Sequence, residues 1–169
     1  CSPKQFSNSE IENLLESRLN LNTFPYQYIG EYFGVDFLNK VSQSNYKKVK
    51  IKDSVFYFDK DIEFEFDENA KIFNIYQKEW ESRAFFYGGN LSNLSINFFG
   101  IENDGKDNFK SYPFDKRGLT GCLSFINLNV SKIKINSSNS NCEDSINLIN
   151  VKGSIKKIDS KDTYGDAID

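Results

Sequence analysis

The segment LSFINLNV, residues 123–130, decides the fold, because it returns at an offset of 23 as INLINVKG, residues 146–153. In both copies apolar residues alternate with polar ones over most of the run, and an asparagine (Asn127 or Asn150) stands between two apolar neighbours. A third copy begins at the C-terminal end of the sequence, at an offset of 22. Short alternating runs that recur at such a spacing are typical of the stacked coils of a β-solenoid.

Earlier copies of the repeat extend the pattern toward the N-terminus. Residues 86–96 match residues 125–135 at an offset of 39, which exceeds the coil offset of 23 by 16. The excess falls in 100–118, which is rich in Asn, Asp, Lys and Gly, so we predict a loop that projects from one corner of the coil. We place residues 70–75 one coil earlier still, at an offset of 21 from 91–96, which gives four or five coils.

Strands are also predicted before the repeats, because apolar and polar residues alternate there or form short apolar runs. These strands cover residues 49–51, 55–58, 62–66 and 72–76, and the acidic segments 59–61 and 67–69 are predicted turns.

The N-terminal part has a different pattern. Residues 9–19 have a capping serine and apolar residues at helical spacing, and residues 26–40 repeat aromatic side chains at a similar spacing. We therefore predict a tether over 1–8, a helical cap over 9–45 and β-helix coils over 46–169. A cap of this kind would cover the unpaired strand edges at the end of the solenoid. An aromatic ligand groove is the alternative for 26–40.

The composition excludes several classes of function. The chain of 169 residues has no histidine, which rules out Ser-His-Asp and Cys-His catalysis and any His-ligated metal site within it. A net charge of −3 argues against a nucleic-acid partner, because such a partner requires a concentrated basic face. The one basic cluster, residues 47–52, alternates with apolar residues and is predicted to be the solvent face of a strand.

The first residues, CSPK, resemble the mature start of a bacterial lipoprotein, in which the signal peptide is cut before a cysteine that is then lipidated. The resemblance implies lipidation of Cys1, a membrane-anchored or extracellular protein, and residues 2–8 as the tether. The alternative is that Cys1 marks the boundary of a fragment.

The repeats themselves resemble the right-handed parallel β-helix proteins of bacteria, the pectate-lyase-like superfamily in the broad sense. The segments that carry the resemblance are GCLSF (121–125), NCEDSIN (141–147) and GDAID (165–169). The resemblance implies a mostly β, right-handed parallel β-helix. Many proteins of this type handle acidic polysaccharides, whereas others are adhesins or spacers, so the fold alone does not choose a function.

Stacking of the coils brings matched side chains within about 4.8 Å of one another. For Asn127 and Asn150 this predicts a ladder of amides at the bend of the chain, which is a structural role. For Asp144 and Asp166 it predicts repelling carboxylates. With Glu143 they form a candidate cation site, for which Ca²⁺ is the candidate ion. With Asp169 they are candidate catalytic carboxylates, and the third interpretation is a turn in which each aspartate accepts backbone N–H groups.

Two cysteines and two aromatic residues complete the candidates. Cys122 and Cys142 approach one corner on neighbouring coils, where they either form a disulfide or stay as buried thiols. Trp80 either stacks on a sugar ring or lies half-buried at a coil edge, and Tyr112 in the 100–118 loop is the second aromatic candidate for binding.

The function we expect from the sequence is a non-catalytic, cell-surface or extracellular β-solenoid module that binds polysaccharide or serves as a structural element. One alternative is a polysaccharide lyase or glycoside hydrolase that uses the stacked carboxylates. However, no Arg or Lys matches the basic residue that lyases of the superfamily place beside Asp-bound Ca²⁺. The other alternative is self-association through the open C-terminal coil, as the subunit of an end-to-end filament.

Overall fold

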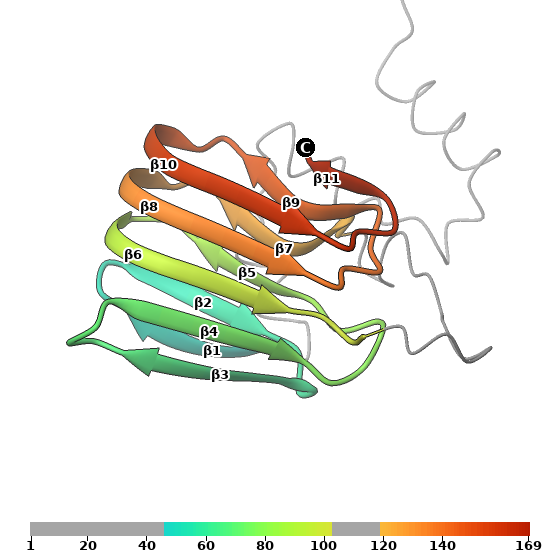
Figure 1. Cartoon of the computed structure of the whole chain (residues 1–169). Helices are drawn as coiled ribbons and strands as arrows, with labels where there is room; N and C mark the ends of the chain where they lie inside the picture. The colour runs from blue at the N-terminus through green and yellow to red at the C-terminus, as the bar shows by residue number, and fades with distance from the viewer. Residues whose placement is uncertain (1–45, 103–118) are drawn as a thin grey trace, which may run out of the picture.

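The computed structural model describes residues 46–102 and 119–169, which fold into two β-sheets that face each other (Figure 1). Sheet A contains, in spatial order, β1 (Lys47–Ile51), β2 (Ser54–Phe58), β5 (Ala84–Tyr87), β7 (Gly121–Ile126), β9 (Asp144–Ile149) and β11 (Asp166–Ile168). Sheet B contains, in spatial order, β10 (Lys152–Lys161), β8 (Asn129–Ser138), β6 (Asn90–Phe99), β4 (Ile72–Gln77) and β3 (Ile62–Asp67).

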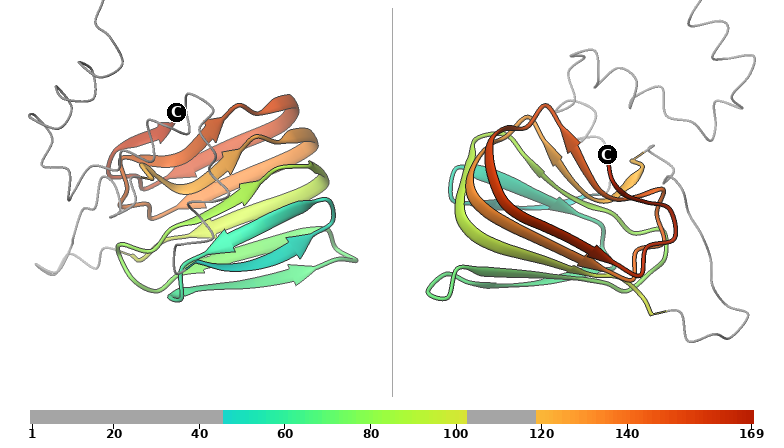
Figure 2. Two further views of the ribbon diagram at one scale, coloured as in Figure 1. Left: turned by 180° about the vertical axis from the view of Figure 1, so that it is seen from behind. Right: turned by 45° about the horizontal axis from the view of Figure 1, so that its top comes forward.

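From β4 onward the chain alternates between the two sheets, and each strand lies parallel to the strand one coil away. This arrangement, two strands per coil with the coils stacked on one another, confirms the prediction of a mostly β solenoid. The views in Figure 2 show the stacked coils from behind and from a raised angle, with the two sheets facing each other. The hand of the coil stays a prediction from the sequence.

The strand register confirms the repeat offsets in the C-terminal half. Leu123 pairs with Ile146 at the predicted offset of 23, and Asp144 pairs with Asp166 at the predicted offset of 22. The offset of 39 is also correct, since β5 pairs with β7 and β6 with β8 at that spacing. The predicted offset of 21 for residues 70–75 is wrong, because Phe73 pairs with Ile96, which is an offset of 23. An even shift leaves the same side chains facing the core, so the apolar pattern could not distinguish the two registers.

The N-terminal end of the solenoid is built from antiparallel hairpins rather than from parallel coils. All four strands predicted before the repeats are present as β1 to β4, but β1 pairs antiparallel with β2, and β3 with β4. Two residues join β1 to β2 and four join β3 to β4, and connections this short permit antiparallel pairing only. The prediction that coils begin at residue 46 is therefore corrected. The predicted tether and helical cap, residues 1–45, lie outside the described residues.

A ladder of phenylalanines fills the interior. Phe56, Phe86 and Phe125 occupy successive strands of sheet A, with ring centroids 4.8 Å apart for the first pair and 5.4 Å for the second. Phe73 packs against the first two from sheet B, and all four side chains are at most 1% exposed. Burial of each ring contributes about 1.5–3 kcal/mol, so this ladder is a main source of stability.

Part of the outer face of sheet A is apolar as well. Neighbouring residues of a strand point to opposite faces, so the pairs Phe85-Phe86 and Phe125-Ile126 send one side chain inward and one outward. The outward side chains form a second buried cluster, made of Tyr57, Phe85, Leu119, Ile126 and Ile149. Tyr46 packs edge-on against Phe85 in this cluster, at 5.0 Å between ring centroids.

The corner between sheets A and B repeats the same backbone conformation from coil to coil. Asn127 and Asn150 have φ values of 52° and 51°, and Gly88, one coil earlier, has 70°. Asparagine and glycine are the residues that adopt this left-handed conformation at least cost. The Asn150 Nδ2 donates to Asn127 Oδ1 at 2.7 Å, and Asn127 Nδ2 donates to the Tyr87 hydroxyl at 3.3 Å, so the structural ladder predicted for the two asparagines is present.

Cys122 and Cys142 form a disulfide at the opposite corner, with their Cα atoms 5.5 Å apart. Of the two alternatives that the sequence left open, the structure therefore has the bridge. Both residues are fully buried in the main core cluster.

Candidate functional site

Asp144 is the candidate carboxylate with the most unusual surroundings. It begins β9, and its residue is only 5% exposed. The Asn147 side-chain nitrogen donates to Thr120 Oγ1 at 2.8 Å and to Asp144 Oδ2 at 3.4 Å. Burial raises the pKa of the Asp144 carboxyl, and the charges of Asp169 and Asp166 raise it further, whereas the side-chain hydrogen bonds of Thr120 and Asn147 lower it.

The side chains of Asp144, Asn147 and Thr120 come together only because Gly121 has no side chain. A Cβ at Gly121 would lie 2.6 Å from Ser124 Oγ and 2.7 Å from Asn147 Cβ, closer than any carbon side chain tolerates. Gly121 pairs with Asp144 across β7 and β9, so the glycine and the carboxylate occupy one step of the sheet. The glycine of the GCLSF motif therefore leaves room for Ser124 Oγ and Asn147 Cβ at the step of the sheet that Gly121 shares with Asp144.

The stacking predicted for Asp144 and Asp166 is present, since the two residues are register partners in β9 and β11. Both Asp166 and Asp169 are exposed, and Glu143 is exposed as well. Among the described residues no group of three or more His, Cys, Asp or Glu side chains is arranged to hold a metal ion. The carboxylates therefore form a neighbourhood of negative charge around one buried acid.

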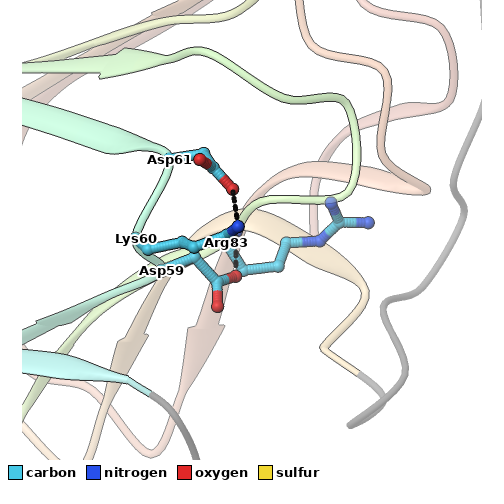
Figure 3. A network of polar contacts seen from close by, with 4 residues as sticks. All are labelled: Asp59, Lys60, Asp61 and Arg83. Carbon is cyan, nitrogen blue, oxygen red and sulfur yellow. Dashed lines mark hydrogen bonds and ion pairs between the residues drawn. The ribbon is translucent and has the colours of Figure 1, made fainter.

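Arg83 is a buried cation that the sequence did not single out. The turn between β2 and β3 is tied to it through the backbone: Arg83 N donates to Asp59 Oδ2 at 2.8 Å, and Asp59 N donates to Arg83 O at 3.1 Å (Figure 3). The nearby ion pair of Lys60 and Asp61, at 3.9 Å, is exposed to solvent and contributes little. In Figure 3 the guanidinium points away from both aspartates.

The Arg83 guanidinium instead reaches backbone carbonyl groups in the loops next to it. Nε donates to the Leu119 oxygen and Nη1 to the Trp80 oxygen, both at 3.4 Å. The Trp80 oxygen also accepts from the Asn141 side chain at 2.7 Å. The side chains that shift the pKa of Asp144 do not include Arg83. Arg83 therefore ties corner loops together, and Trp80 lies half-buried at that corner.

The outer face of sheet B presents a continuous column of polar side chains. Register places five residues in line across the five strands: Glu65, Asn74, Asn97, Asn136 and Asp159. The three amides are bonded in series: Asn136 Nδ2 donates to Asn97 Oδ1 and Asn97 Nδ2 donates to Asn74 Oδ1, both at 2.8 Å. All three are half-buried, so their remaining donors and acceptors face the solvent side of the sheet.

An aromatic pair lies in the next column of the same face. Tyr76 and Phe99 are register partners whose rings stack with centroids 5.2 Å apart and an interplanar angle of 15°. The Lys78 ammonium lies 5.7 Å from the Tyr76 centroid, and Phe99 is 40% exposed. One coil further, the column continues with Ser138, whose small side chain covers little of the Phe99 ring.

The amide ladder and the aromatic pair were not predicted, although the sequence repeat contains a signal for the ladder. The offset of 39 already aligns Asn97 with Asn136, and the correct offset of 23 aligns Asn74 with Asn97. The offset of 21 hid the second match.

The remaining predicted site residues, Cys1, Tyr112 and the 103–118 part of the loop, lie outside the described residues. Comparison of the chain with protein-family models, with curated proteins and with solved structures returned no match. Within residues 46–102 and 119–169 there is also no helix long and apolar enough to cross a membrane.

Proposed function

We propose that this protein is a non-catalytic β-solenoid module of the cell surface or extracellular space that binds polysaccharide through the outer face of sheet B. The observation that carries the proposal is the pairing of an exposed aromatic ring with a ladder of amides on the outer face of sheet B. Phe99 offers an uncovered ring face for the apolar side of a sugar ring, and Tyr76 supports it from behind.

The amide ladder supplies the polar half of such a site. An asparagine side chain has two donors and two acceptor lone pairs, and the ladder uses one donor of Asn97 and one acceptor position. The remaining donors and acceptors of the amides can reach hydroxyl groups of a glycan that lies along the column. The repeat spacing of the coils, about 4.8 Å, is close to the length of one sugar unit, so an extended chain can contact several coils in turn.

The test is a binding assay with the full chain against a panel of soluble and insoluble polysaccharides. The double substitution Tyr76→Ala/Phe99→Ala is expected to reduce binding about tenfold or more, because stacked aromatic contacts contribute roughly 0.5–1.5 kcal/mol each beyond their burial. Tyr164→Ala is the matched control, since Tyr164 is 62% exposed and lies outside sheet B. Equal loss in the control, or binding by none of the panel, would contradict the proposal.

The polysaccharide lyase or hydrolase is the second candidate, because the pKa of Asp144 is raised and two more aspartates lie near it. A raised pKa is what a general acid requires. Cleavage of uronate polymers that disappears in Asp144→Asn and persists in Tyr76→Ala would favour this enzyme. Retention of any cleavage by Asp144→Asn would exclude Asp144 as its acid. We also propose that the coil is right-handed and that the protein is related to the pectate-lyase-like β-helix proteins.

The disulfide of Cys122 and Cys142 supports export, because such bridges persist in oxidising compartments. Lipidation of Cys1, which the resemblance of CSPK to bacterial lipoproteins implies, is part of the same proposal. The intact mass of protein purified from its own cells tests this. A mass above that of the sequence by fatty-acyl increments supports the anchor, and an unmodified Cys1 contradicts it.

A further inference from the structure

Within residues 46–102 and 119–169, each end of the solenoid has two strands that pair on one side only. In sheet B these edge strands are β3 and β10, and in sheet A they are β1 and β11. Figure 1 shows β1 and β3 at one end of the stack and β10 and β11 at the other. An edge strand carries unpaired N–H and C=O groups that can pair with another strand.

The charges at the two ends of sheet B are opposite. β10 carries four lysines and one aspartate, a net charge of +3, and β3 carries two glutamates and one aspartate, a net charge of −3. The four lysines of β10 and all three acids of β3 are exposed.

Sheet A shows the reverse pattern. Its edge at the β1 end has three exposed lysines, Lys47, Lys48 and Lys50. Its edge at the β11 end has two exposed aspartates, Asp166 and Asp169. Each end of the solenoid therefore has one basic and one acidic edge, and the pattern at one end complements the pattern at the other.

The core is also incompletely covered at both ends of sheet B. Ile155 and Ile158 of β10, and Phe64 and Phe66 of β3, pack against the main cluster but stay only partly buried. If one end stacked on the other, these apolar side chains would be buried against apolar side chains of the next copy.

We propose that copies of this chain assemble head to tail, with β10 and β11 of one copy on β3 and β1 of the next. Strand directions permit this. β1 runs parallel to β11, and β3 runs antiparallel to β10, so the new pairs are one parallel and one antiparallel ladder.

Continuing the columns of sheet B into the next copy fixes the facing charges. The column that runs from Glu63 through Tyr76 and Phe99 ends at Lys161, so Lys161 meets Glu63 of the next copy. In the same register Lys157 meets Asp67. Opposite charges that face each other across strands are stabilising. Asp159 meets Glu65, and its charge is offset within β10 by the ion pair with Lys157.

The same charges oppose the symmetric alternatives. Pairing β10 with β10 places lysines against lysines, and pairing β3 with β3 places carboxylates against carboxylates. A head-to-tail contact uses two different surfaces, so it continues to grow unless the rotation closes a ring.

The test is sedimentation velocity of the full chain over a range of concentrations, at about 20 mM and about 500 mM salt. Wild type is expected to rise about twofold or more above the monomer mass with concentration at low salt, and to return to monomer at high salt. Lys157→Glu/Lys161→Glu and Glu63→Lys/Asp67→Lys are each expected to stay monomeric, because each places like charges at both facing positions. An equimolar mixture of the two is expected to regain assembly, because each then faces an end of opposite charge.

The control is Lys132→Glu/Lys134→Glu, which makes the same charge change on β8, inside sheet B rather than at its edge. It is expected to assemble as wild type does, and circular dichroism checks that each variant keeps its β structure. Wild type that stays monomeric at low salt would overturn the proposal. So would a dimer that does not grow, or a mixture of the two end variants that stays monomeric.

Discussion

Removal of one asparagine from the middle of the sheet B ladder should cost about twice as much as removal of one from its end. Asn97 makes two amide bonds, donating to Asn74 Oδ1 and accepting from Asn136 Nδ2, each at 2.8 Å. A side-chain hydrogen bond contributes about 0.5–1.5 kcal/mol net, so Asn97→Ala should lower the free energy of unfolding by about 1–3 kcal/mol. Asn136→Ala removes one bond and should cost about 0.5–1.5 kcal/mol.

Solvent access limits the free-energy cost of each of these substitutions. Because the ladder is half-buried, the amide groups that lose a partner can bind water, and no full desolvation penalty is left behind. The double variant Asn97→Ala/Asn136→Ala breaks the shared bond only once, so its cost should fall short of the sum of the single costs by about 0.5–1.5 kcal/mol.

Urea unfolding followed by fluorescence measures these differences. The chain has one tryptophan, Trp80, which lies half-buried at a corner of the solenoid and reports its unfolding. The midpoint should shift while the dependence on urea concentration stays constant. If Asn97→Ala costs no more than Asn136→Ala, or if the two costs add fully, the amides do not act as a bonded ladder and the reasoning is refuted.

Three further substitutions test other parts of the structure. Phe86→Ala removes the centre of the phenylalanine ladder and should cost about 3–5 kcal/mol in urea unfolding, whereas Phe99→Ala, on the exposed face, should change stability by less than about 1 kcal/mol; similar costs would contradict the assigned faces. Gly121→Ala should cost about 1–3 kcal/mol, because its Cβ would lie 2.6 Å from Ser124 Oγ, and a neutral result would show that the strand relaxes freely. Asp144→Asn should raise the thermal midpoint at pH 7. Because the pKa of Asp144 is raised on folding, its ionisation opposes folding, and the gain should shrink as the pH falls toward the usual aspartate pKa of about 3.9, below which Asp144 is protonated in both the folded and the unfolded state. A gain that grows toward acid pH would contradict the sign.

The sequence predicted the solenoid because its evidence is local and repeated. Matched apolar residues at offsets of 23 and 39 reveal which residues stack, and the pairs Leu123 with Ile146 and Phe86 with Phe125 follow directly. Corner residues can also be predicted from the sequence, because a left-handed backbone favours asparagine and glycine. Asn127 and Asn150 adopt this conformation.

The candidate site was predictable only in part. The Asp144 and Asp166 stack follows from the repeat, but the burial that raises the pKa of Asp144 depends on packing around β9. The role of Arg83 could not be predicted, because nothing in the sequence around a single loop arginine indicates that it will be fully buried among carbonyl groups.

What the sequence determined alone is therefore the coil: its period, its inward side chains and its corners, all of which depend on residues near one another in the chain. What only the tertiary structure decided is how the coils end and what their faces present. The alternation of apolar and polar residues in β1 to β4 is the same in parallel and antiparallel strands, so the alternation alone did not predict the hairpins, although their short connections permit antiparallel pairing only. The line of Asn74, Asn97 and Asn136 likewise exists only once three separate coils are stacked in register, because no hydrogen bond of that ladder joins residues that are close in sequence.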